Sequence, residues 1–391
     1  MLWLNFLHFY QPANADKKNF LEAVTNNYER IVRGLEENNQ IKFTVNLSGC
    51  LLMRLDHEFK RIDLIRRIKR LVLKKQLELV GSAAYHPILP LIGQQQAYDQ
   101  ILENKKILSN YFGDNIKIRG FFLPEMAYSQ ESAKLIKSFG YEWIILDEIQ
   151  ANGKLNQIDH SQIFKDKNSD LDVIFRNREF SQTYIPATLL NKKYNDDQVI
   201  VSATDAELYG LRHIDEPADF EKLLKNTEAL NIKTALISDY IDSAKNKKNI
   251  KVIPSSWEST EEELIQKNSY NLWYNKNNKI QKQLWELANF SQAMFYKHQT
   301  DKNSWWSQWH LVRGLASCTF WWSSGRDLTK VFGPIAWNPD QIELGAQELA
   351  RSVRCLESST SLEEKLLTEK KLNNVIKNVW NEHWTKYKII N

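Results

Sequence analysis

Two apolar runs of the sequence each end on a carboxylate. Residues 121–125 read Phe-Phe-Leu-Pro-Glu, and residues 199–205 read Val-Ile-Val-Ser-Ala-Thr-Asp. An unpaired carboxylate costs several kcal/mol to bury, so Glu125 and Asp205 are predicted to mark strand ends rather than to join the core. Glycoside cleavage needs two such groups, because one protonates the leaving oxygen while the other attacks or stabilises the sugar cation. Either residue alone would suit an ordinary strand-end cap, whereas the pair with its surroundings favours chemistry.

Polar or aromatic residues follow most of the other expected strands as well. In chain order they are His8, Asn46, His86, Glu125, Asp147, Arg176, Asp205 and Trp257. In a barrel of parallel strands the carboxyl ends of the strands form the floor of the active site. We therefore expect these side chains to gather at one end of the fold, since chance would place only two or three of them there.

The first part of the chain alternates between β-favouring runs and amphipathic stretches such as residues 18–37 and 96–111. This alternation predicts a parallel sheet with helical crossovers, and its length favours a closed or nearly closed α/β barrel. The expected strands are residues 2–9, 41–47, 77–82, 118–123, 143–146, 171–176, 199–203, 234–238 and 251–254.

After Trp257 the strand pattern stops and helical periodicity takes over. We therefore predict a catalytic barrel over residues 1–258 and a C-terminal helical region over residues 259–391 that contributes to the active-site cleft. The expected helices are residues 280–296, 305–322, 339–356 and 362–380.

The overall composition excludes several classes of protein. Lys and Arg total 52 against 48 Asp and Glu, a net charge of +4 that predicts neither a nucleic acid nor a membrane partner. The basic run over residues 61–75 has apolar residues at helical spacing and reads as a solvated helix face. Three widely spaced cysteines make no disulfide framework, which predicts a reducing compartment. The apolar N-terminus lacks a basic leader and reads as the first strand, so we expect a cytoplasmic protein.

Five short motifs then carry a family resemblance. They are His-Phe-Tyr-Gln-Pro at 8–12, Gln-Leu-Glu-Leu-Val-Gly at 76–81 with Tyr-His-Pro-Ile-Leu-Pro at 85–90, Phe-Leu-Pro-Glu at 122–125, Asp-Ala-Glu-Leu-Tyr-Gly at 205–210, and Ser-Cys-Thr-Phe-Trp-Trp at 317–322. Together and in this order they resemble glycoside hydrolase family 57, the retaining α-glucan-active enzymes. The resemblance runs from Met1 to about Gly325. It implies an incomplete (β/α)7 TIM-like barrel with a helical C-terminal part, Glu125 as nucleophile and Asp205 as acid/base.

Three positions depart from the family pattern. Tyr10 stands where many relatives have His, Phe122 where some have Trp, and Cys318 near a position often held by Asp. All three lie in elements that contact substrate in the family. They bear on sugar specificity more than on the reaction.

The catalytic pair is surrounded by candidate substrate-binding residues. Asp205 must carry a proton to act as the acid, and Glu207 points the same way along a strand and could serve instead. We favour Asp205, with Glu207 as a neighbour that binds sugar hydroxyls. Arg176 and Arg212 could either set the charge of these carboxylates or form ordinary salt bridges. The remaining hydroxyl-binding candidates are His8, Gln11, Glu78 and His86.

Aromatic side chains complete the predicted site. Trp257, Trp321 and Trp322 could stack on the apolar face of a pyranose. Residues Trp305, Trp306 and Trp309 lie on an expected helix and are predicted to pack in the core.

The function predicted from these residues is a retaining α-glycosidase or glucanotransferase that acts on α-glucans or oligosaccharides by double displacement. A metal-dependent carbohydrate deacetylase is the alternative enzyme, because strand-end histidines can bind zinc. No compact His-x-x-x-His pair is present, so neither a metal nor another cofactor is expected. A non-catalytic carbohydrate-binding homologue is the second alternative, and the presence of both Glu125 and Asp205 argues against it.

Overall fold

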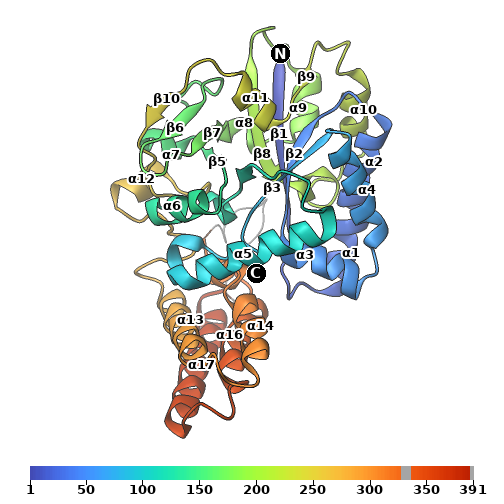
Figure 1. Cartoon of the computed structure of the whole chain (residues 1–391). Helices are drawn as coiled ribbons and strands as arrows, with labels where there is room; N and C mark the ends of the chain where they lie inside the picture. Colours follow the sequence, from blue (N-terminus) through green and yellow to red (C-terminus); the bar gives the residue numbers. More distant parts are fainter. Residues whose placement is uncertain (327–335, 388–391) are drawn as a thin grey trace. The chain divides into compact units, whose positions relative to one another are not determined.

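The computed structural model describes residues 1–326 and 336–387 (Figure 1). Contacts divide the chain into two compact units. Unit 1 comprises Met1–Ala84 and Ile101–Trp257, and unit 2 comprises Tyr85–Gln100 and Glu258–Asn391. The sequence prediction placed residues 85–100 in the barrel, whereas the structure groups them with the C-terminal helices.

Unit 1 contains two mainly parallel sheets. The first has the order β3 (Leu77–Val80), β2 (Phe43–Leu47), β1 (Leu2–Phe9), β8 (Val199–Asp205), with β9 (Lys233–Thr234) also pairing with β1. The second has the order β10 (Lys248–Ile250), β6 (Phe164–Asp166), β7 (Asp172–Arg176), β5 (Trp143–Asp147), β4 (Gly120–Phe121).

The two sheets meet at both sides and so form a ring. A parallel bridge between Gly81 and Phe121 joins the end of β3 to β4. On the other side the backbone N–H of Asn177 donates to the carbonyl of Val201 at 2.9 Å, which joins β7 to β8. The strands therefore follow one another around an incomplete (β/α)7 barrel, as the sequence predicts.

Helices join the strands of unit 1 (Figure 1). They are α1 (Lys17–Ala23), α2 (Glu29–Glu37), α3 (Gly49–Met53), α4 (Ile62–Leu73), α5 (Gln94–Phe112, of which the part from Ile101 on belongs to unit 1), α6 (Gln130–Ser138), α7 (Ile149–Asn152), α8 (Arg178–Ser181), α9 (Ile185–Asn191), α10 (Asp219–Asn226) and α11 (Ile237–Ser243). A π-helical turn, Val24–Tyr28, connects α1 to α2. The ring of Trp143 packs directly against the backbone of Gly120. A Cβ at position 120 would lie 2.2 Å from this ring, so only glycine fits there.

Two of the predicted strands are wrong. The run 234–238 is a strand only as far as Thr234, and α11 begins three residues later. The first N–H groups of α11 are held by side chains from other strands: Thr44 accepts from Ile237 at 3.1 Å and Glu78 accepts from Ser238 at 3.2 Å. The first N–H groups of a helix have no acceptor within the helix, and here residues from distant strands supply the acceptors. The run 251–254 has no strand, because pairing with β6 ends at Ile250.

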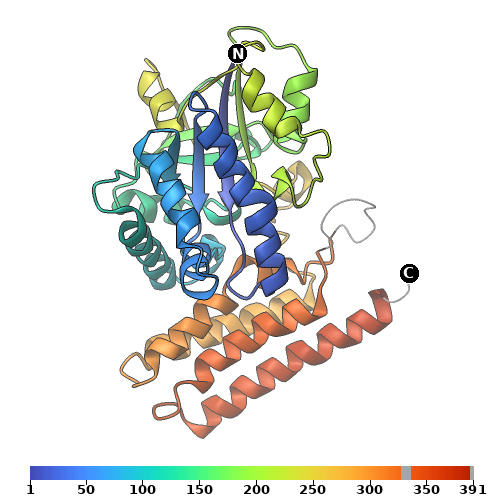
Figure 2. The ribbon, with the colours of Figure 1, turned by 90° about the vertical axis from the view of Figure 1, so that its right-hand side faces the viewer.

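Unit 2 is helical in its C-terminal part. Its helices are α12 (Glu261–Ile265), α13 (Lys279–Lys297), α14 (Ser304–Gly314), α15 (Ser317–Trp321), α16 (Pro339–Arg354) and α17 (Leu362–Glu382). The four longest, α13, α14, α16 and α17, run alongside one another (Figures 1 and 2). In the described part of the chain, no helix is long and apolar enough to span a membrane.

The predicted helix 305–322 is broken into α14 and α15. At the break Ala316 forms an antiparallel bridge with Pro87, and the N–H of Ser317 donates to the carbonyl of His86 at 2.9 Å. These bonds with a distant segment replace the helical ones. The interruption fixes where α15, with Trp321 at its end, begins.

Candidate active site

Glu125 is presented by a strained turn at the end of β4. The strand runs into a 3-10 turn, Pro124–Met126, in which Glu125 has φ 58° and ψ 19° and Met126 has φ 49°. Left-handed backbone costs a residue with a Cβ about 1–2 kcal/mol. Such strain persists only where the surroundings hold the residue in place, and it is concentrated at functional sites.

Trp257 is the residue that holds Glu125. The indole N–H donates to Oε2 of Glu125 at 2.8 Å, and the backbone N–H of Trp257 donates to the carbonyl of Glu125 at 3.1 Å. The indole is held in turn by Arg176, whose guanidinium lies 4.9 Å from the ring centroid. The hydrogen bond from the indole N–H fixes the orientation of the Glu125 carboxylate.

Arg176 forms a buried ion pair with Asp147. Its Nε donates to Asp147 at 2.7 Å, and the other oxygen of Asp147 accepts from Arg178. Asp147, predicted as one of the polar groups at the strand ends, is fully buried in this pairing. Arg176 therefore helps to position Trp257, whose indole N–H donates to Glu125.

Asp205 closes β8 and lies in register with His8 of β1. Its Oδ2 accepts a hydrogen bond from Nη1 of Arg212 at 2.6 Å. Since the Arg212 side chain is 47% exposed, water screens this ion pair. Of the two arginines left open by the sequence, Arg212 is the one that pairs with the predicted acid/base.

His8 is paired in register with Asp205, and its ring lies near two aromatic residues that neighbour or contact Glu125. Its ring lies 4.7 Å from that of Phe122 and 6.4 Å from that of Trp257. Burial lowers the pKa of His8 to about 4, against the opposing effect of Asp205. The imidazole is therefore neutral at neutral pH, and since an amide oxygen only accepts, we assign its Nδ1 as donor to Asn46 at 2.8 Å.

Glu207 lies under the site rather than on its surface. It is 2% exposed, and its Oε1 accepts hydrogen bonds from the Tyr28 hydroxyl and from Gln11 Nε2, the latter at 2.9 Å. Burial raises the pKa of Glu207 to about 7, and the charge of Asp205 adds to this while Arg212 opposes it. Glu207 and Gln11 thus bond to each other, and their predicted binding of sugar hydroxyls stays a prediction.

Tyr28 is a site residue that the sequence did not reveal. It reads as one more apolar position of an amphipathic helix, and its partner is distant in the sequence. In the structure Tyr28 ends a π-helical turn, and such turns are frequent at functional sites.

Replacing Glu207 by Gln should remove a pH dependence of stability. A carboxyl whose folded-state pKa is about 7 instead of 4.5 stabilises the fold below pH 4.5, and this stability is lost as the pH rises through 7. Glu207→Gln keeps an acceptor oxygen for Tyr28 and Gln11 and has no proton to lose. Denaturant titrations measure the free energy of unfolding at each pH. Between pH 4.5 and 8 this free energy should fall by a few kcal/mol more in the wild type than in the variant.

The exposed Glu228 supplies the control for this experiment, because Glu228→Gln makes the same chemical change outside the site. Its stability should follow the wild-type pH curve. Parallel curves for Glu207→Gln and wild type would contradict the assignment of the proton to Glu207.

Glu78 lies nearer the start of the strands than His8 does. The pairing register places Glu78 opposite Thr44 and places His8 opposite Asn46, two residues further along β2. Its carboxylate accepts from the Thr44 hydroxyl at 2.9 Å and caps α11, and burial raises its pKa. These contacts are structural, and substrate binding by Glu78 stays a prediction.

Three predicted substrate-binding residues belong to unit 2, where they are brought close together. His86 is buried with φ 59°, and its Nδ1 lies 3.0 Å from the hydroxyl of Ser317, the first residue of α15. Trp321 and Trp322 follow at the end of α15, with ring centroids 4.5 Å apart and both rings partly exposed. His86 therefore fixes the helix that carries the two tryptophans.

The prediction that the tryptophans of α14 pack in the core is wrong for two of the three. Trp305 is 61% exposed and Trp306 is 51% exposed, whereas Trp309 is half-buried. Helix α14 packs through another face, on which Ser307 and Leu311 are buried. Helical spacing alone does not decide which face of a helix meets the core.

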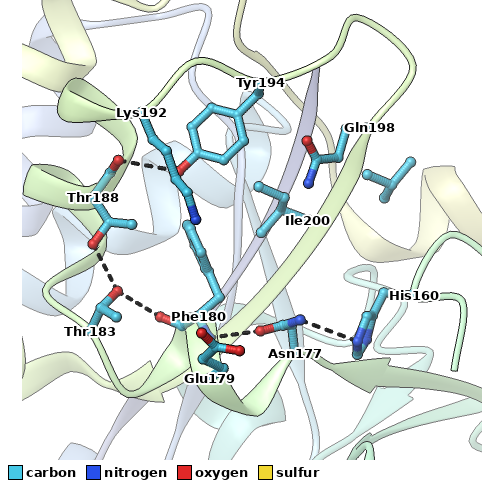
Figure 3. A pocket seen from close by; sticks show the side chains of 11 residues that line it. His160, Asn177, Glu179, Phe180, Thr183, Thr188, Lys192, Tyr194, Gln198 and Ile200 are labelled. Carbon is cyan, nitrogen blue, oxygen red and sulfur yellow. Dashed lines mark hydrogen bonds between the residues drawn. The ribbon is translucent and has the colours of Figure 1, made fainter. Parts of the chain in front are cut away.

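A cavity of about 220 Å³ lies elsewhere in unit 1, beside the first residues of β8 (Figure 3). Tyr194, Lys192 and Asn177 line it, and Asn177 lies 3.2 Å from Nε2 of His160. Within the described part of the chain, none of the predicted catalytic or substrate-binding residues lines this cavity.

The described ranges 1–326 and 336–387 contain no group of three or more His, Cys, Asp and Glu residues arranged to hold a metal ion. The strand-end histidines are engaged otherwise, His8 with Asn46 and His86 with Ser317. The geometry of a zinc deacetylase is thus not found among these residues.

Comparison with known proteins decides the family. A model of glycosyl hydrolase family 57 matches residues 4–254, well over half of the chain. The chain belongs to this family. The match covers the motifs of unit 1, including both predicted catalytic carboxylates.

Similar sequences within the family have two activities in their names. An α-amylase from Pyrococcus horikoshii is 30% identical over 148 residues, 37% of this chain and 23% of that protein. A 4-α-glucanotransferase from Thermococcus kodakarensis is 31% identical over 156 residues, 38% of this chain and 22% of that protein. The stretch of the family 57 chain that matches thus covers less than a quarter of the length of each of these relatives.

Solved structures share the fold. A GH57-type branching enzyme from Pyrococcus horikoshii superposes with a TM-score of 0.70 at 16% identity, covering 95% of this chain and 94% of that one. A 4-α-glucanotransferase from Thermococcus litoralis gives 0.67 at 15% identity, covering 90% and 60%. At these identities the likeness establishes the fold of this family 57 protein and confirms the predicted barrel with a helical C-terminal region.

Proposed function

We propose that this protein is a retaining glycoside hydrolase or transglycosidase that cleaves α-glycosidic bonds of α-glucans or oligosaccharides. The observation that carries the proposal is the placement of Glu125 in the turn after β4 and of Asp205 at the end of β8, in register with His8, whose ring lies near those of Phe122 and Trp257. Family membership and the named activities of similar sequences support the same substrate class.

In the first half of the reaction, the Glu125 carboxylate attacks the anomeric carbon and a covalent glycosyl-enzyme forms. Asp205 donates its proton to the departing glycosidic oxygen. The hydrogen bond from Trp257 keeps the Glu125 carboxylate oriented for attack, and the neutral His8 can hydrogen-bond sugar hydroxyls without adding charge.

In the second half, Asp205 is ionised and removes a proton from the incoming acceptor, which is water in hydrolysis and a sugar hydroxyl in transfer. In the structure the Asp205 carboxylate accepts a hydrogen bond from Arg212. The oxygen of the acceptor then displaces Glu125 from the anomeric carbon, which restores its original configuration.

The anomer of the first product tests this mechanism. Double displacement needs carboxyl groups about 5–5.5 Å apart, and inversion about 6.5–9.5 Å. We expect NMR spectra taken early in turnover of a maltooligosaccharide to show the α-anomer, with the β-anomer growing in only by mutarotation. A β-anomer as the first product would rule out the retaining mechanism.

A further inference from the structure

An exposed aromatic stripe runs along α14. It consists of Trp305, Trp306 and Trp309 with Arg313 beyond them. The ring centroids of Trp305 and Trp306 lie 4.6 Å apart, and those of Trp306 and Trp309 lie 5.9 Å apart. At 1.5 Å per residue, the stripe from Trp305 to Arg313 is about 12 Å long, longer than one pyranose ring.

Contacts along α14 and with α16 hold the stripe in place. The guanidinium of Arg313 lies 3.2 Å from the centroid of the Trp309 ring and donates to the Trp309 carbonyl at 2.9 Å. On the opposite face of the helix, the Ser307 and Ser352 hydroxyls lie 3.1 Å apart and the ring of His310 lies 2.7 Å from Glu348. The tryptophans therefore project from an anchored helix.

The stripe continues toward the predicted substrate-binding residues of unit 2. Arg313 also lies 5.5 Å from the ring of Tyr85, and Tyr85 directly precedes His86. His86 is bonded to Ser317 at the start of α15, which ends at Trp321. Surface tryptophans and the sugar-stacking candidates Trp321 and Trp322 are thus joined through one chain of contacts.

We propose that the Trp305–Trp306–Trp309 stripe binds an α-glucan chain at several successive glucose units, outside the bonds being cleaved. This inference rests on the proposed function, because it assumes that the chain being held is the α-glucan substrate. Flat aromatic faces stack on the C–H faces of pyranoses, and a neutral polymer needs no charged partner. The polar neighbours Asn303 and Gln308 can hydrogen-bond hydroxyls at the edge of the stripe.

The double variant W305A/W306A tests the stripe. Migration in native gels containing glycogen measures polymer binding, and we expect the variant to lose about tenfold in affinity. The KM for amylose should rise by a similar factor. The kcat/KM for a short maltooligosaccharide and the thermal midpoint should stay within twofold and within a few degrees of the wild type, because the stripe contains none of the predicted catalytic residues and its two exposed tryptophans are not packed in the core.

Trp384→Ala is the matched control, because Trp384 is another tryptophan of unit 2, 56% exposed, that lies outside the stripe. It should bind glycogen as the wild type does. Equal retardation of wild type and W305A/W306A by glycogen would overturn the inference, and so would an equal loss on short and long substrates. A change of oligomeric state in the double variant, seen by light scattering, would instead make the stripe an interface between copies.

The two proposals fail in different ways. If the wild type cleaves maltooligosaccharides while glycogen binding does not depend on the stripe, only the inference is overturned. If the wild type neither cleaves nor binds any α-glucan, the proposed function itself is wrong. A β-glucan that retards the wild type as strongly as glycogen would show that the stripe does not recognise α-glucan chains.

Discussion

Glu125→Gln should lower turnover of an α-glucan by at least three orders of magnitude while the fold remains intact. The amide has nearly the same shape as the carboxylate, and its oxygen can still accept the hydrogen bond from the Trp257 indole. It cannot attack the anomeric carbon as an anion, and so the covalent route is closed. Initial rates on a maltooligosaccharide, with circular dichroism as a check on folding, measure the effect.

A covalent label gives an independent readout for the same residue. A fluorosugar with a good leaving group should add one glycosyl unit to the wild type, detected by intact mass, and none to Glu125→Gln. Glu228→Gln, the exposed control used above for stability, should label and turn over normally. A tenth or more of the wild-type rate in Glu125→Gln would mean that another residue is the nucleophile.

Asp205→Asn should have an effect that depends on the leaving group. General acid catalysis contributes about 10²–10⁴-fold, so kcat/KM for a natural glycosidic bond should fall by this factor. A glycosyl fluoride needs little protonation to depart and should still form the glycosyl-enzyme quickly. Because the variant lacks a base for the second step, the intermediate should accumulate and azide should restore its turnover.

Asp242→Asn is the control for this variant, since Asp242 forms an exposed ion pair with Arg119 in the same unit. Its rates should equal those of the wild type for both kinds of substrate. If Asp205→Asn slows the fluoride and the natural substrate equally, and azide has no effect, Asp205 is not the acid/base. The protonatable Glu207 is then the next residue to test in the same way.

Much of unit 1 could be predicted because its signals are local. The longer strands, such as β1, β5 and β8, are apolar runs, and a carboxylate that ends such a run is predicted to lie at the strand end. The short polar strands β6 and β10 carry no such signal and were not predicted. The errors occur where distant residues decide the local structure. Residues 237–238 begin a helix because Thr44 and Glu78 accept from their N–H groups, and these partners lie far away in the sequence.

The same reasoning separates the predictable from the unpredictable parts of the site. The positions of Glu125 and Asp205 at strand ends follow from the sequence pattern. The burial of Glu207 does not, because it depends on Tyr28 of the π-helical turn. The exposure of Trp305 depends on which face of α14 meets α16, and the helical period leaves that choice open.

The turn at Glu125 also has a consequence for engineering this protein. Glycine adopts the left-handed conformation of this residue at no steric cost, and so it would suit the backbone better than glutamate does. A search for heat-tolerant variants by stability alone would therefore favour glycine at position 125 and discard the carboxylate that we propose as the nucleophile. Screens for thermal tolerance in this chain should keep position 125 fixed, because the residue that favours stability there differs from the one that we propose for activity.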